Sequence, residues 1–194
     1  MATGRIVIIT GPSSAGKTSI ISAFRETQAA IGRYWHSVGV DDVLGRLHWR
    51  WVDVGWPSGP GPFAPMGMAI VNDGEHARIR IGPLLRSLLR GYQAGAVAIA
   101  GEGVDVLVED VIFDQEHLEG WYGILADRDA RFVDVRCDAD EMARREAERS
   151  DRPRGLARAE RLAAYTRPDF DLTLDTTSTT SGENARRLSR YLGV

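Results

Sequence analysis

The sequence predicts an α/β protein in which a five-stranded parallel sheet lies between two layers of helices. Short apolar runs of strand length alternate along the chain with longer amphipathic segments, which is typical of parallel strands joined by right-handed helical crossovers. The chain has 194 residues, of which 43% are hydrophobic and 26% are charged, and this composition is that of a globular domain. We therefore expect a single three-layer domain over residues 1–194.

The first strand is predicted at Arg5–Thr10, a continuous β-branched run of the kind that is buried on both faces at the centre of a parallel sheet. The next residues, GPSSAGKT, match the pattern G-x-x-x-x-G-K-[ST], and a helix is expected at 17–30. In this pattern the loop amides and the positive end of the helix attract phosphate oxygens. The sequence therefore predicts a nucleotide-binding loop formed by Gly11, Pro12, Ser13, Ser14, Ala15, Gly16, Lys17 and Thr18.

Two residues of this loop have specific expected roles. The ammonium of Lys17 would reach the β- and γ-phosphates of a nucleoside triphosphate, and the hydroxyl of Thr18 would ligate Mg²⁺. Lys17 is the only lysine of the chain, because every other one of the 24 Lys and Arg residues is arginine. A lysine at this position, in a chain whose other basic residues are arginine, indicates that an ammonium group is needed there.

A second strand is expected at 34–38, after which residues 49–82 interrupt the alternation of strands and helices. This stretch is rich in Trp, Pro and Gly. We interpret it as an excursion over the sheet on the substrate side rather than as a second domain. Within it, the turn signal Asn72-Asp73-Gly74 lies between two apolar runs at 68–71 and 76–81, which predicts a hairpin.

The remaining residues return to the alternating pattern. Pro83 is placed in the first turn of a long amphipathic segment, where proline is tolerated, and Gly101 and Gly103 end it. In order, the expected elements are a helix at 83–100, a strand at 104–109, a helix at 116–126, a strand at 131–136, a charged helix from 140, a strand at 171–175 and a helix at 182–192.

Carboxylates follow two of the expected strands. Ligands of an open parallel sheet bind outside the carboxyl ends of its strands, so acids there face the same crevice as the phosphate loop. Glu109 and Asp110 stand at the end of the strand expected at 104–109. Asp110 is the first candidate to hold magnesium together with Thr18, and Glu109 is the second. In the other pair, Asp41 or Asp42 could take the proton of an attacking hydroxyl, or both could only cap the following helix.

Residues 144–161 are rich in arginine. Charge runs of this kind usually mark a solvated helix face with pairs such as Glu141 with Arg145. Beside a nucleotide site, however, guanidinium groups on a closing segment stabilise the transferring phosphoryl group and exclude water. Pro153 and Gly155 would let the segment bend out of the helix, so we treat 144–161 as a candidate lid.

The overall charge and the cysteine content restrict the partners. A net charge of −3 gives no reason to expect nucleic acid or an anionic membrane as a partner. Cys137 is the single cysteine, so no intramolecular disulfide can form, which is consistent with a reducing cytoplasm. No signal peptide or membrane span is recognisable. We expect a cytoplasmic protein that acts on a small molecule, and a homo-oligomer is compatible with the sequence.

Several short motifs occur in an order that is characteristic of one enzyme family. They are GPSSAGKT, Gly39-Val40-Asp41, Ile81-Gly82-Pro83, the strand at 104–111, Val135-Arg136-Cys137-Asp138, Arg149-Ser150-Asp151-Arg152 and DLTLDTT at 171–177. In these motifs the chain resembles the chloramphenicol phosphotransferases over nearly its whole length. The resemblance implies a P-loop kinase-like fold and an enzyme that moves the γ-phosphate of ATP to a primary hydroxyl of the antibiotic.

The resemblance also implies roles for particular residues. Asp41 matches the family's proposed catalytic base, and Arg149 and Arg152 match lid arginines that face the phosphates. Near the adenine, the resemblance places Asp175, Thr176 and Thr177.

The aromatic residues of the 49–82 excursion are candidates for the acceptor pocket. The part of the excursion at 49–68 is longer and more aromatic than the corresponding region of the family, and this is where acceptor specificity is expected. Aromatic side chains can line an apolar pocket, but they also anchor loops to a core. The candidates are Trp49, Trp56 and Phe63.

We therefore expect an ATP- and Mg²⁺-dependent phosphotransferase that acts on a hydroxyl of a small, partly apolar molecule, as an antibiotic-resistance kinase does. Its catalytic residues would be Asp41, Lys17, Arg149 and Arg152, with magnesium held by Thr18 and Asp110. Two alternatives stay open. One is a kinase of a nucleoside or polynucleotide 5′-hydroxyl, and the other is a regulatory P-loop ATPase whose arginine-rich segment senses the γ-phosphate.

Overall fold

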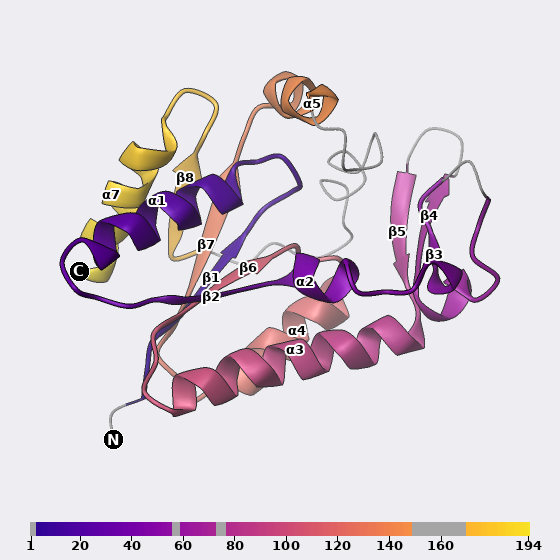
Figure 1. The fold of residues 1–194 in the computed structure, drawn as a ribbon, viewed down its shortest axis with the longest axis horizontal. Helices are drawn as coiled ribbons and strands as arrows, with labels where there is room; N and C mark the ends of the chain where they lie inside the picture. The colour runs from indigo at the N-terminus through magenta and orange to yellow at the C-terminus, as the bar shows by residue number, and fades with distance from the viewer. Residues whose placement is uncertain (1–2, 56–58, 73–76, 149–169) are drawn as a thin grey trace.

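A computed structural model describes residues 3–55, 59–72, 77–148 and 170–194, and its main body is a parallel sheet with helices on both faces (Figure 1). The sheet has five strands in the order β2-β6-β1-β7-β8, so β1 is central, as its β-branched sequence predicts. This confirms the predicted α/β class. The strands are β1 (Ile6–Thr10), β2 (His36–Gly39), β6 (Val106–Asp110), β7 (Ala130–Arg136) and β8 (Leu172–Asp175).

Two helix layers bury the two faces of the sheet. Side chains of β1 alternate between them: Val7 and Ile9 pack in the core beneath α1 and α7, and Ile6 and Ile8 pack in the core against α3 and α4. Such alternation on a strand buried on both faces requires the apolar run that the sequence shows. The helices are α1 (Lys17–Ala29), α7 (Ser181–Leu192), α3 (Pro83–Gly101) and α4 (Gln115–Leu125).

The carboxyl ends of the strands meet at one edge of the sheet. Gly39 of β2 is level with Glu109 of β6, and Thr10 of β1 is level with Asp110. Two short helices begin at this edge, α2 (Val40–Leu44) directly after β2 and α5 (Ala139–Ala147) after β7. The segments that follow all the strands are therefore brought together, although they are far apart in the sequence.

The excursion forms a small second sheet with the order β3-β4-β5. β4 and β5 pair antiparallel, which confirms the predicted hairpin, and β3 pairs parallel to β4, which the sequence did not indicate. The small sheet lies beyond the N-terminal end of α3 rather than across the main sheet (Figure 1). Its elements are η1 (Trp49–Trp51), β3 (Val52–Asp53), η2 (Ala64–Met66), β4 (Met68–Asn72) and β5 (Ala77–Ile81).

A third apolar cluster joins the excursion to the main body. Val52 and Met68 of the small sheet pack with Leu85 and Leu89 of α3 and with Val40 of α2. The start of α2 is therefore held by the same core that holds the excursion. Among the described residues, no helix is both long and apolar enough to span a membrane.

Candidate active site

The phosphate-binding loop, residues 11–18, curves around the start of α1. Gly11 has φ +150°, and a Cβ atom there would lie 2.4 Å from the carbonyl oxygen of Val135, so only glycine fits the close approach of the loop to β7. Gly16 is the N-cap of α1 with φ 94°, a left-handed conformation. Because Gly16 has no side chain, no N-cap hydrogen bond occupies the amides of the first turn, which are the groups that bind anions at a helix start.

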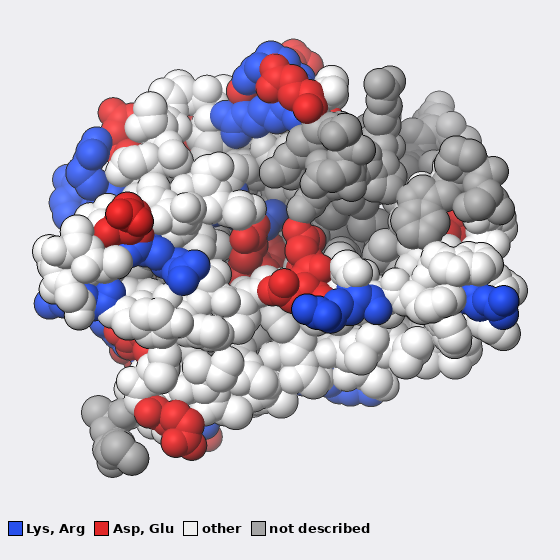
Figure 2. Space-filling view, in the orientation of Figure 1, with Lys and Arg blue, Asp and Glu red and all other residues white. Residues whose placement is uncertain are grey.

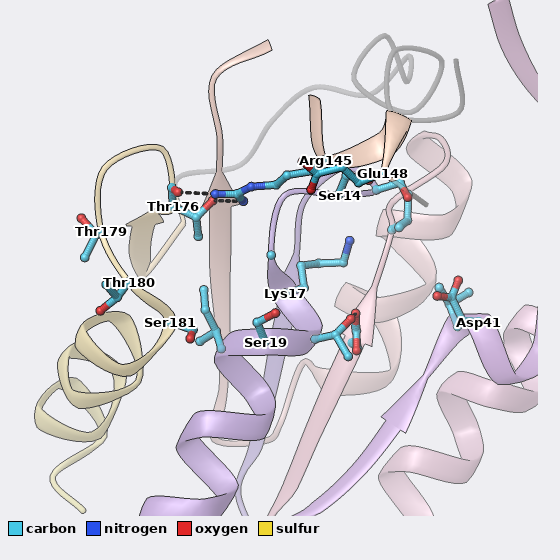
Figure 3. A pocket seen from close by; sticks show the side chains of 17 residues that line it. Ser14, Lys17, Ser19, Asp41, Arg145, Glu148, Thr176, Thr179, Thr180 and Ser181 are labelled. Atoms are coloured by element: carbon cyan, nitrogen blue, oxygen red, sulfur yellow. Dashed lines mark hydrogen bonds between the residues drawn. The ribbon is translucent and has the colours of Figure 1, made fainter. Parts of the chain in front are cut away.

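Lys17 fixes the shape of this loop from inside. Its side chain is only 6% exposed, and Nζ donates hydrogen bonds to the carbonyl oxygens of Gly11 at 2.7 Å and of Pro12 at 3.0 Å. The side chain still lines the cavity in front of the loop (Figure 3). The structure thus places a positive charge at the mouth of a loop built for phosphate oxygens.

The carboxylates at the end of β6 point to opposite faces of the sheet, and this corrects the prediction for Asp110. Glu109 lines the cavity, and its Oε1 accepts a hydrogen bond of 2.6 Å from the hydroxyl of Thr18. Asp110 is 0% exposed and bonds to the indole of Trp121 instead. Because side chains alternate along a strand, only one of two neighbours can face the loop, and that residue is Glu109.

The carboxylates after β2 also differ in role. Asp42 accepts a hydrogen bond of 3.2 Å from the amide of Gly39, which caps the first turn of α2. Asp41 lines the cavity (Figure 3). The sequence left open whether these acids cap the helix or face the phosphate loop. In the structure Asp42 is the cap, and Asp41 lines the cavity in front of the loop.

Gly16, Lys17 and Thr18 of the loop line one cavity of about 410 Å³ at the carboxyl edge of the sheet, together with Asp41 and Glu109. In Figure 2, acidic side chains gather in a hollow near the middle of the face, beside α2. In Figure 3, Lys17 lies between Asp41 on one side and the loop after β8 on the other. The lining residues from that loop are Thr176, Thr179, Thr180 and Ser181.

Arg145 of α5 closes the side of the cavity opposite Asp41. Its guanidinium donates to the carbonyl oxygen of Thr176 at 2.7 Å and to the hydroxyl of Thr176 at 3.2 Å, and Nε donates to Glu141 at 2.8 Å. Hydrogen bonds from Arg144 and then from Arg145 lower the pKa of Glu141 to about 2. The predicted pair of Glu141 with Arg145 is thus present, and Arg145, which lies within the candidate lid at 144–161, also lines the cavity.

The three residues expected near the adenine have different positions. Thr176 lines the cavity and its hydroxyl donates a 2.7 Å hydrogen bond to the carbonyl oxygen of Ala15 in the phosphate loop. Asp175 accepts from the amide of Thr177, and the Thr177 hydroxyl accepts from the amide of Asp138. Asp175 and Thr177 therefore shape the turn that presents Thr176.

The aromatic candidates of the excursion do not border this cavity in the described part of the chain. Trp49 and Phe63 are 49% and 45% exposed, and the Phe63 ring packs on Trp51 at a centroid distance of 5.1 Å. Trp56, Arg149 and Arg152 lie outside the described residues, as does most of the candidate lid at 144–161. Their roles stay predictions.

The sequence did not single out Glu148 or Arg145 as site residues. Both line the cavity from the C-terminal part of the α5 region. The signal that could have found them is positional: α5 begins directly after β7, at the edge of the sheet where the phosphate loop lies, so its side chains can reach the crevice.

Known proteins are similar to this chain over nearly its whole length. A family model described as "Chloramphenicol phosphotransferase-like protein" matches residues 4–192. A Mycobacterium tuberculosis protein named "Putative O-phosphotransferase" is 31% identical over 189 residues, which are 97% of this chain and 82% of that protein.

Solved structures share the fold. The APS kinase CysC of M. tuberculosis, solved in complex with AMPPNP and APS, superposes with a TM-score of 0.65 at 21% identity, with all of both chains covered. Shikimate kinase from Acinetobacter baumannii, in complex with shikimate, gives 0.52 at 14% identity and covers 99% of this chain and 95% of that chain. The chain thus has the fold of P-loop kinases.

Proposed function

The chain belongs to the chloramphenicol phosphotransferase-like family, and we propose that it transfers the γ-phosphate of ATP to a hydroxyl group of a small, partly apolar molecule, with Mg²⁺ as cofactor. The observation that carries the proposal is that one cavity joins the phosphate loop, with Lys17, to the carboxylate of Asp41. A site that only binds or hydrolyses a nucleotide does not need a proton acceptor for an alcohol beside the phosphate loop.

ATP would bind with its phosphates in the loop and its nucleoside toward the β8–α7 side. The first-turn amides of α1 and the ammonium of Lys17 supply donors for the phosphate oxygens. Thr176 and the hydroxyl side chains that follow it form the wall on the other side of the cavity. Arg145 is held beside Thr176 by two hydrogen bonds, so its charge is fixed next to the nucleotide.

The residues at the loop fit a magnesium ion that is held mainly by the nucleotide. The described residues contain no group of three or more His, Cys, Asp or Glu side chains that could hold a metal alone. Magnesium commonly takes one or two protein oxygens and completes its shell with phosphate oxygens and water. The Thr18 hydroxyl and the Glu109 carboxylate, 2.6 Å apart, supply such oxygens, and Glu109 takes the place that the sequence gave to Asp110. The ion would neutralise phosphate charge.

In the proposed chemical step, Asp41 accepts the proton of the acceptor's hydroxyl group. The acceptor oxygen forms a bond to the γ-phosphorus while the bond from that phosphorus to the β–γ bridging oxygen breaks, and the hydroxyl proton moves to the Asp41 carboxylate. ADP and a phosphate ester are the products. Arg145, with Arg149 and Arg152 of the candidate lid, would stabilise the charge on the transferring group.

The acceptor is proposed to be uncharged in its reacting part and partly apolar. Beside Asp41, the cavity is lined by Val40 and Val111, which are both buried. Hydroxylated antibiotics, including chloramphenicol, fit this description and the family, and the aromatic residues of the excursion, Trp49, Trp56 and Phe63, remain candidates for the outer part of the acceptor site.

The test is a screen of hydroxylated antibiotics with the purified protein, ATP and Mg²⁺. ADP release and the mass of the acceptor are read in the same reaction, with a Lys17→Met variant as the control for contaminating kinases. We expect at least one acceptor to gain the mass of one phosphate while ADP accumulates. Release of ADP at one unchanged rate with every compound, with no acceptor gaining mass, would contradict the proposal.

A further inference from the structure

A buried polar cluster lies behind the cavity, on the opposite face of β6. Asp110 accepts hydrogen bonds from the amide of Val111 at 2.7 Å and from Nε1 of Trp121 at 2.6 Å, and Nε2 of His117 lies 3.3 Å from the same carboxylate oxygen as the indole. His117 and Trp121 are one helical turn apart on α4, so they share a face. A buried carboxylate is costly unless it is paired, and here α4 supplies the partners.

A residue of α3 also contacts the end of β6, next to Asp110. The hydroxyl of Tyr92 donates to the carbonyl oxygen of Glu109 at 3.2 Å, and its ring packs edge-on against Trp121 with the centroids 5.8 Å apart. The peptide group before Asp110 is thus bonded by Tyr92, and the peptide group after it is bonded by the carboxylate of Asp110. The backbone at the end of β6 is held on both sides of one residue.

The Asp110 carboxylate also affects the pKa of the neighbouring imidazole. Burial by itself lowers the pKa of His117, but the Asp110 carboxylate outweighs this effect and raises it. Both side chains are 0% exposed, so water does not screen the attraction. The Val111 amide and the Trp121 indole hold the carboxylate by hydrogen bonds, and the His117 ring lies 3.3 Å from it. The backbone from which the neighbouring Glu109 side chain projects to the cavity face is therefore held in place.

We propose that Trp121 and His117 are positioning residues that act through Asp110 to hold the Glu109 carboxylate beside Thr18. The proposal rests on the assignment of Glu109 to magnesium in the proposed function. Partners that orient a metal-binding side chain typically change metal affinity or activity by about ten- to a hundredfold when they are removed. A cluster that only stabilised the packing of α3 on α4 would affect unfolding and leave magnesium-dependent binding unchanged.

The test measures binding of AMPPNP by isothermal titration calorimetry, with and without Mg²⁺ and without any acceptor. The quantity of interest is the ratio of the two dissociation constants, which we call the magnesium gain. Trp121→Phe removes the indole donor and keeps an aromatic ring in the core. We expect it to reduce the magnesium gain by about tenfold, with metal-free affinity unchanged within about twofold. His117→Gln should act in the same direction, and it serves as the second variant if Trp121→Phe does not fold.

Two controls separate positioning from stability. Leu118→Ala removes a buried side chain of α4 that belongs to the apolar core, so it should lower the unfolding temperature and leave the magnesium gain intact. In a Glu109→Gln background, Trp121→Phe should cause no further loss of the gain, because both substitutions act at one carboxylate.

The outcomes divide clearly. The inference is overturned if the gain is unchanged in Trp121→Phe and His117→Gln, if it falls equally in Leu118→Ala, or if Trp121→Phe lowers it further when Glu109 is already Gln. If Glu109→Gln alone leaves the wild-type gain, the magnesium assignment of the proposed function is wrong and the inference is wrong with it. That arm of the experiment identifies which of the two has failed.

Discussion

Two pairs of neighbouring acids lie at the carboxyl ends of two strands of the same sheet, and in each pair only one acid faces the cavity. After β2, Asp41 faces the cavity and Asp42 caps a helix; at the end of β6, Glu109 faces the cavity and Asp110 is buried behind the sheet. The cavity-facing acid is the first of each pair, but for different reasons.

The local backbone decides which acid faces the cavity. In β6 the extended strand sends successive side chains to opposite faces, so Glu109 and Asp110 must separate. In α2 the chain has turned into a helix, and Asp42 reaches back to the Gly39 amide as a cap. A pair of acids at a sheet edge therefore indicates where a site lies, and the secondary structure selects the member that serves it.

The largest expected effect is on the rate of phosphoryl transfer, and it distinguishes Asp41 from Asp42 in α2. Asp41→Asn keeps the shape of the side chain and removes the proton acceptor, so the rate of phosphoryl transfer should fall by about a hundred- to ten-thousandfold. Nucleotide affinity should be unchanged. Asp42→Asn is the matched control, and its transfer rate should stay close to that of the wild-type protein. If the transfer rate, measured with the same acceptor, fell equally in both variants, Asp41 would not be the catalytic base in distinction from Asp42.

The next effect is on stability at β6. Asp110→Asn leaves a side chain of the same size but takes away the charge that pairs with His117 and one acceptor that the Trp121 indole needs. The free energy of unfolding should fall by about 2–4 kcal/mol, because a buried partner is left uncompensated. Urea unfolding measures this. A loss smaller than that of Asp42→Ala would mean that Asp110 does not anchor the strand.

A third effect depends on pH and concerns the acid that starts α4. Burial raises the pKa of Asp114, but hydrogen bonds from Arg86 and from the His117 amide outweigh it, so the pKa lies below its ordinary value of 3.8. The stabilisation is therefore complete above pH 3.8 and is lost as the pH falls through the lowered pKa. Asp114→Asn should cost about 1 kcal/mol at neutral pH. Urea midpoints that differ equally in neutral and strongly acidic buffer would contradict this.

The smallest effect is that of the helix cap. Asp42→Ala removes the acceptor for the Gly39 amide at an exposed position, which should lower the free energy of unfolding by about 0.5–1 kcal/mol. The measurement is again urea unfolding of the variant beside the wild type. A loss above that of Asp110→Asn would invert the expected order of the two structural acids.

Much of the fold could be predicted from the sequence because it depends on local patterns. The β-branched run of β1 indicates the central strand, and Pro83 indicates the start of α3 to the residue. The hairpin of the excursion follows from its turn residues. The parallel addition of β3 to that hairpin could not be predicted, since two residues carry no period and the pairing is made across a long loop.

The candidate site could be predicted in part. The phosphate loop has a fixed spacing, so its residues follow from the pattern alone. Which of Glu109 and Asp110 faces the cavity depends on where β6 ends relative to the loop. Strand ends are predicted from a sequence only to within one or two residues, so the sequence could not decide between these neighbours. The start of α5 directly after β7 indicates that its side chains can reach the crevice. Which of them do so, Arg145 included, depends on the angle at which α5 leaves the sheet, and no local signal encodes that angle.

Above all, we propose that this cavity transfers phosphate to an alcohol rather than to water. The most direct measurement is the yield of acceptor phosphate ester per ADP, determined by ³¹P NMR with an acceptor from the screen. We expect one ester for each ADP, with inorganic phosphate absent from the early part of the reaction. Release of inorganic phosphate in step with ADP, whether or not the acceptor is present, would contradict it.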